Sequence, residues 1–183
     1  LKICEKVFDK HGIASAMHNI GIIYKHKGDY KKAIKSITHA LNTFEEMDDK
    51  LGVANSLGNL GLFSLGKGNY NEALEYLERA KENYEKLNDQ MRIGISLNNI
   101  GNVYRHQYYY ENALEVFHEA LEIQKKIGAT MQMGYTLGSI GLINFDIGDY
   151  NKALEYHNQA FVINERCNDK PQMITSLNNI GSV

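Results

Sequence analysis

The chain has 183 residues, and its 20 Lys and Arg against 22 Asp and Glu give a formal net charge of −2. This near-neutral balance supplies neither the basic face that nucleic-acid binding requires nor a polybasic segment for a membrane surface, so we expect neither partner. The longest run without a charged side chain, 127–145, holds several glycines and polar residues and is too polar to cross a bilayer.

A five-residue pattern, apolar-x-x-apolar-Gly, returns every 40 residues along the whole chain. Its copies are Met17–Gly21, Leu57–Gly61, Leu97–Gly101, Leu137–Gly141 and Leu177–Gly181. A fixed period of this length is the signature of a repeat array, in which small units stack on their neighbours. We therefore predict a single array over 1–183: 1–10 end a partial repeat, 11–50, 51–90, 91–130 and 131–170 are full repeats, and 171–183 begin another.

Both ends of the chain fall within repeats, and the first residue is Leu1 rather than Met. We therefore expect a piece of a longer protein. The two cysteines, Cys4 and Cys167, are about four repeats apart, too far for a disulfide in such an array. The cytoplasm is the default location that this composition suggests.

The first half of each repeat predicts a helix, here called helix A, which in the second full repeat runs from Gly52 to about Gly66. Leu57, Leu60 and Gly61 follow one another at i, i+3 and i+4 and share one face. A glycine inside a helix costs about 1 kcal/mol relative to alanine. Its return in every repeat predicts a compensating close approach by the second helix of the repeat.

The second half predicts helix B, which begins after a turn and carries a stripe of small and large apolar residues at spacings of 3 and 4. Asp29, Asn69 and Asp149 stand where an N-cap is expected. In the last full repeat His157 takes the large apolar position, which favours a packed core histidine. The third repeat replaces the glycine of the turn with Tyr108, at an expected cost of about 1 kcal/mol or more.

These columns resemble the tetratricopeptide repeat, a helix–turn–helix unit. The matching residues of the second full repeat are Leu57, Leu60, Gly61, Gly68, Tyr70, Ala73, Leu77 and Ala80. The period of 40 instead of about 34, and the missing proline after helix B, predict longer helices. This variant resembles the long-repeat subtype of Pins/LGN adaptors, kinesin light chains and Rap-type regulators. The resemblance implies an all-α fold, a right-handed α-solenoid of antiparallel helix pairs, whose A helices line a concave surface that binds peptides or protein segments.

The A helices carry almost no charge, so the face opposite their core stripe is the candidate site. A column of Asn19, Asn59, Asn99, Ser139 and Asn179 runs along it. Amides donate and accept hydrogen bonds, so the column can bind the backbone of an extended peptide. Alternatively, the same amides bond the neighbouring helix and stabilise stacking, and the two roles are compatible. The predicted groove consists of Asn19, Ile22, Asn59, Leu62, Leu65, Asn98, Asn99, Asn102, Arg105, Leu142, Phe145 and Asn179.

No set of side chains suggests catalysis. None of the seven histidines stands at metal-ligand spacing, and no nucleophile–base pair stands out, so we expect no enzyme, cofactor or metal. Some tetratricopeptide domains bind chaperone C-termini through a carboxylate clamp of Lys and Arg on the A helices. The A helices here carry few Lys and Arg, so we expect no such clamp. The first hypothesis is a scaffold that binds a protein or peptide in the groove. The alternative is a sensory or regulatory region of a larger signalling enzyme or transcription regulator. Self-association through the incomplete end repeats is a further expectation.

Overall fold

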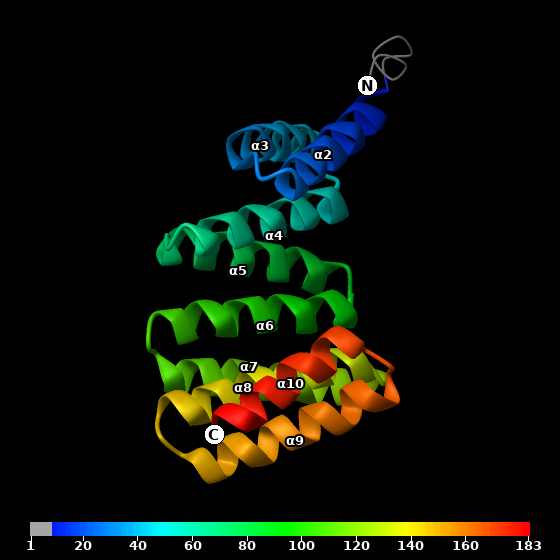
Figure 1. Ribbon diagram of the computed structural model, residues 1–183. Coiled ribbons are helices and arrows are strands. Elements are labelled where there is room, and N and C mark those ends of the chain that lie inside the picture. Colours follow the sequence, from blue (N-terminus) through cyan, green and yellow to red (C-terminus); the bar gives the residue numbers. More distant parts are fainter. Residues whose placement is uncertain (1–8) are drawn as a thin grey trace. The chain divides into compact units, whose positions relative to one another are not determined.

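The computed structural model describes residues 9–183, and these form nine α-helices and no strand (Figure 1). The helices are α2 Lys10–His26, α3 Tyr30–Glu46, α4 Lys50–Gly66, α5 Tyr70–Lys86, α6 Gln90–His106, α7 Tyr110–Ile127, α8 Thr130–Asp146, α9 Tyr150–Arg166 and α10 Lys170–Ser182. The all-α prediction is confirmed. Most of the predicted partial repeat at 1–10, with Cys4, lies outside the described residues.

The helices alternate between A helices (α2, α4, α6, α8 and α10) and B helices (α3, α5, α7 and α9). Each A helix from α2 to α8 turns back into its B helix through three residues, so the two run antiparallel (Figure 1). From α2 to α9 every helix has 17 or 18 residues, as the long period predicts. The chain forms two compact units: the first ends at Asp89 and contains α2–α5, and the second begins at Gln90 and contains α6–α10.

In the four full repeats the glycine of the signature lies where the two helices of the repeat cross. A Cβ atom on Gly21 would be 2.5 Å from the Ile37 side chain, and one on Gly101 would be 2.7 Å from the Phe117 ring. The predicted close approach of helix B is therefore confirmed. The last full repeat has His157 in the position of Phe117, only 1% exposed, which confirms a packed histidine.

Helix caps agree with the prediction at two of three B helices. Asp29 and Asp149 accept bonds from the first turns of α3 and α9. Asn69 is the N-cap residue of α5, as predicted, but the expected cap bond is absent and its Nδ2 donates to Glu72 Oε2 at 3.3 Å. The A helices have caps that the sequence analysis did not identify. Asp49 accepts from the Gly52 backbone nitrogen at 3.0 Å, so α4 begins two residues before the predicted Gly52.

The turn of the third repeat contains a strained residue. Tyr108 has φ +62° and is 76% exposed, whereas the corresponding Gly68 has φ +78°. Tyrosine rarely adopts this left-handed conformation, and glycine adopts it freely. The expected non-glycine turn is therefore confirmed, and the helices on either side of it are intact.

Candidate functional site

All twelve predicted groove residues are half-buried or exposed, and none belongs to the core. They lie on the A helices, which keep charged side chains away from this surface over most of their length. Their positions therefore permit contact with a partner. The structure gathers only some of them into hollows, and it does so separately in the two units.

In the second unit, a hollow of about 300 Å³ lies between α6 and α8, and we call it the amide hollow. Its lining residues are Ile95, Asn98, Asn99, Asn102, Gln132, Tyr135 and Ser139. Three of them, Asn98, Asn99 and Asn102, are predicted groove residues. Burial and the nearby Asp169 carboxylate raise the pKa of the Tyr135 hydroxyl, so it is a neutral donor near pH 7. No lining side chain of this hollow is charged.

Beneath the amide hollow lies a polar group of side chains centred on Thr136, which is fully buried. The Thr136 Oγ1 atom is 2.9 Å from Asn98 Oδ1, 2.7 Å from Gln124 Oε1 and 3.0 Å from the Gln132 backbone oxygen. Gln124 belongs to helix α7 and is only 1% exposed. The side chain of Asn98 is therefore held from below by Thr136, which Gln124 contacts in turn.

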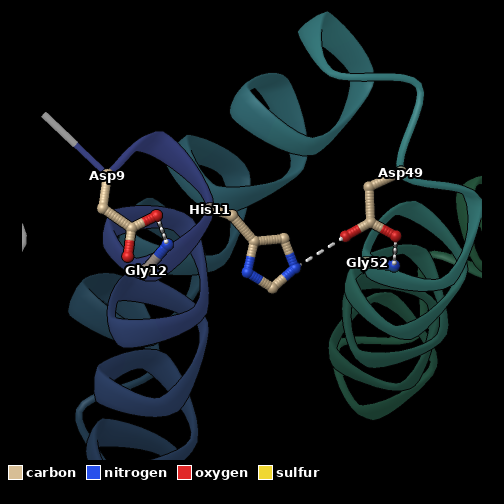
Figure 2. A network of polar contacts seen from close by, with 5 residues as sticks. All are labelled: Asp9, His11, Gly12, Asp49 and Gly52. Atoms are coloured by element: carbon tan, nitrogen blue, oxygen red, sulfur yellow. Dashed lines mark hydrogen bonds and ion pairs between the residues drawn. The ribbon is translucent and has the colours of Figure 1, made fainter.

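In the first unit, a second hollow of about 300 Å³ lies between α2 and α4, and we call it the histidine hollow. Its lining residues are His11, Ser15, His18, Asn19, Phe44, Asp49, Leu51, Gly52 and Asn55. Figure 2 shows the His11 ring of α2 directed at Asp49, the residue that caps α4. The His11 Nε2 atom lies 3.2 Å from Asp49 Oδ2, while Oδ1 accepts from the Gly52 nitrogen.

His18 is held on both sides of its ring. Its Nδ1 lies 3.1 Å from Ser56 Oγ, and its Nε2 lies 3.4 Å from Asn59 Nδ2. Asn59 Nδ2 also donates to the Asn55 backbone oxygen at 3.0 Å. Because an amide nitrogen only donates, His18 Nε2 accepts, and the proton of the neutral ring is on Nδ1. Burial lowers the pKa of His18, which favours this neutral form.

The two hollows occupy the same place in the repeat, two periods apart. Five lining positions coincide: Ser15 with Ile95, His18 with Asn98, Asn19 with Asn99, Gly52 with Gln132, and Asn55 with Tyr135. The contact below them is equivalent as well, since His18 meets Ser56 as Asn98 meets Thr136. The repeat therefore builds the same hollow twice with different side chains.

Other predicted groove residues have packing partners or lie outside these hollows. Asn59 joins α2 to α4 through His18, as the stacking alternative expects. Arg105 forms an ion pair with Asp146 at 3.0 Å, and the Phe145 ring packs edge-to-face on Tyr150. The remaining predicted residues line neither hollow: Ile22, Leu62, Leu65, Leu142 and Asn179.

Most lining residues that the sequence analysis missed lie on the A helices themselves, among them Asn55, Gln132 and Tyr135. Phe44 lines the histidine hollow from helix B α3, and Asp49 lines it from the cap of α4. Gln124 of helix B α7 contacts Thr136 below the amide hollow. Within 9–183 the structure contains no group of three or more His, Cys, Asp or Glu arranged to hold a metal ion. Across the same residues, every helix is too short or too polar to span a membrane.

The tetratricopeptide-repeat family model matches residues 12–86, 52–126 and 92–161. These matches cover most of the chain, which therefore belongs to the tetratricopeptide-repeat family. No curated protein sequence matches it.

Three of the solved structures that are similar to the chain illustrate its fold. They are aspartyl phosphate phosphatase F from Bacillus subtilis (18% identity, TM-score 0.86), a signal transduction ATPase with a tetratricopeptide repeat sensor from Pyrococcus horikoshii (19%, 0.85), and a Rap protein complexed with competence and sporulation factor (20%, 0.78). The alignments cover 92%, 94% and 90% of this chain and 44%, 27% and 46% of those proteins. The chain thus spans less than half of each. At these identities the likeness establishes the fold, a tetratricopeptide-like solenoid, as predicted.

Proposed function

We propose that the chain is a non-enzymatic interaction module that binds an extended segment of a protein or peptide on its A helices. Membership of the tetratricopeptide-repeat family supports a protein-interaction role. The observation that carries the proposal is the recurrence of one hollow at the same place in the repeat in both units. The repeat geometry places a hollow here in both units, and side chains at coinciding positions line it, so a single extended segment could be contacted in the same way at each.

The amide hollow has the chemistry for backbone contact. Asn99 and Asn102 line it, and within 9–183 their side chains make no hydrogen bond. An extended peptide offers one donor and one acceptor per residue, which match the two ends of an amide. Each such bond contributes about 0.5–1.5 kcal/mol net, so several together with buried apolar surface support an affinity near the micromolar range.

The test uses a displayed random peptide library selected on the whole chain, followed by binding assays with the synthesised peptides. We expect the double substitution Asn99→Ala and Asn102→Ala to weaken binding by tenfold or more. The matched control is Asn42→Ala, which changes an exposed amide on helix B α3 and should leave binding unchanged. Equal binding by the parent and a stably folded double variant would contradict the proposal that the segment binds in the amide hollow.

The alternative function is a sensory region within a larger signalling protein. Its support is the similar archaeal structure whose tetratricopeptide repeats are described as a sensor. A sensor must change on binding, so hydrogen exchange distinguishes the two functions. Protection that spreads beyond the helices of the occupied hollow favours the sensor, and protection confined to those helices favours the simple module.

Helix α10 supports a further part of the proposal, the association of two copies at high concentration. Its Leu177 is 51% exposed, whereas the equivalent Leu57 and Leu137 are 0% and 4% exposed. Light scattering across a concentration series should give a rising mass, and Leu177→Gln should reduce the rise. A constant monomer mass would contradict this part alone.

A further inference from the structure

The contacts of the Thr136 hydroxyl, at the floor of the amide hollow, cannot all be hydrogen bonds if Asn98 and Gln124 both direct their carboxamide oxygens at it. The Thr136 hydroxyl lies within 2.7–3.0 Å of the carboxamides of Asn98 and Gln124 and of the Gln132 carbonyl. A hydroxyl has one proton and two lone pairs, so it donates one bond and accepts two. With both carboxamide oxygens toward it, two of the three contacts would join oxygens without a proton, inside the protein.

One arrangement turns all three contacts into hydrogen bonds. The oxygen and nitrogen of a carboxamide have nearly the same shape, so their orientation follows from the hydrogen-bond network. Thr136 donates to the Gln132 carbonyl, a usual bond for a threonine within a helix, and accepts from Asn98 Nδ2 and Gln124 Nε2. This arrangement gives the Gln124 nitrogen a partner, and the Gln124 oxygen then takes the buried position that has none.

The orientation of Asn98 has a consequence for the hollow. When its nitrogen is directed at Thr136, its oxygen is at the opposite end of the carboxamide, on the side of the hollow. We infer that the amide hollow presents the Asn98 carbonyl as a fixed acceptor and selects a segment with a carboxamide side chain, Gln or Asn. This inference rests on the proposed function and names the chemistry of its ligand.

A carboxamide fits this hollow better than a charged group. Its N–H group donates to the Asn98 oxygen, and its own oxygen accepts from Asn99 or Asn102. A carboxylate has no proton to donate, and its negative charge would be repelled by the partial negative charge of the Asn98 oxygen. An ammonium would lose its hydration where no lining residue carries a negative charge.

The histidine hollow does not share this selection. There the equivalent residue is His18, whose Nδ1–H is directed at Ser56 while Nε2 accepts from Asn59. The hydroxyl below the hollow therefore accepts from a ring and not from a carboxamide. Ser56→Ala is for this reason a matched control for substitutions of Thr136.

The experiment uses four pools of ten-residue peptides, with uncharged random positions and a central Gln, Glu, Lys or Leu. We expect the whole chain to capture the Gln pool at least tenfold better than the Glu pool. Thr136→Val removes the hydroxyl and frees Asn98 to turn, so the preference should fall below threefold, whereas Ser56→Ala should retain it.

A second measurement needs no ligand and protects the test against an unstable Thr136→Val. In the ¹⁵N-labelled parent, the side-chain amide protons of Asn98 and Gln124 should both show nuclear Overhauser effects to the Thr136 side chain. Their absence for Asn98 would overturn the inferred orientation. Equal capture of the Gln and Glu pools would overturn the inference and leave the proposed function, while capture of no pool would overturn both.

Discussion

The histidine hollow and the amide hollow are built by the same part of the repeat, yet they differ in chemistry. The first is lined by two imidazoles, a carboxylate and the Phe44 ring, and the second by amides over a buried hydroxyl. Backbone geometry is common to both, since the lining positions coincide two periods apart. The repeat therefore fixes where a hollow lies, and a few side chains decide what it can bind.

The largest effect should come from breaking the helix crossing below the amide hollow. Gly101→Ala places a methyl group 2.7 Å from the Phe117 ring, which cannot bend aside, so we expect a loss of about 2–3 kcal/mol in the free energy of unfolding. Gly138 is the control, because a Cβ there meets nothing within 4 Å. Gly138→Ala should gain up to about 1 kcal/mol from helix propensity. Urea denaturation measures both, and similar losses would contradict the crossing argument.

The next largest effect concerns His157, which in the second unit takes the place that Leu77 has in the first. The His157 Nδ1 atom is buried without a partner. His157→Leu should therefore stabilise the chain by about 1–2 kcal/mol at pH 7, measured by urea denaturation. An unchanged or lower stability would mean that the ring has a hydrogen-bond partner or fills its site better than leucine.

The same histidine predicts a pH dependence. Burial lowers the pKa of His157 and of His18 below their ordinary value of 6.5. Between the lowered pKa and 6.5 the unfolded chain binds more protons than the folded one, so stability falls as the pH falls through this window. Above the window the stability contribution of the neutral rings is fully present. His157→Leu should reduce the slope of the free energy of unfolding against pH in this window. Adding His18→Asn should remove the rest of the slope that the two rings cause.

A transplant sharpens the comparison of the hollows. His18→Asn, Ser56→Thr and Phe44→Gln together give the first unit the floor of the second. The three substitutions are made in a chain that also carries Asn98→Ala, which removes the acceptor of the amide hollow. This variant should prefer the Gln pool over the Glu pool by tenfold, about 1.4 kcal/mol. Failure to gain it, with a cooperative melting curve retained, would mean that the floor alone does not decide selection.

The smallest effect concerns the turns of the two units. Tyr108 holds a left-handed conformation that Gly68 adopts without strain. Tyr108→Gly should raise the free energy of unfolding by about 1 kcal/mol, while Gly68→Ala should lower it by a similar amount. The melting temperatures of both variants test this, and a destabilising Tyr108→Gly would indicate that the tyrosine ring contributes more through its contacts than its backbone costs.

The sequence predicted the helix pairs well because both of their determinants are periodic. The glycine column and the stripe of helix B each depend on residues at fixed spacing, and the crossings at Gly21 and Gly101 follow from them. Competition between alternative hydrogen-bond partners of one side chain was harder to predict. Asn69 has the right type and position for a cap, but its amide instead donates to Glu72.

The site could be predicted only where one helix supplies it. Asn98, Asn99 and Asn102 share one face of α6, so the A-helix pattern identified them. Phe44 lines the histidine hollow from helix B, and Gln124 contacts Thr136 from helix B, each at a contact with the next A helix. That contact depends on the rotation between neighbouring repeats. The spacing of residues within one repeat carries no information about this rotation. The predicted Leu62 and Leu142 line neither hollow, although Asn102 at the same repeat position lines one.

Asp49 divides its two oxygens between two tasks, because one caps α4 through Gly52 and the other meets His11 (Figure 2). A ligand that draws the His11 ring away changes the charge distribution on that carboxylate without entering α4. The backbone proton of Gly52 is thus a natural spectroscopic probe of the histidine hollow. Its chemical shift reports occupancy from within the protein, with no dye or label attached to the surface under study.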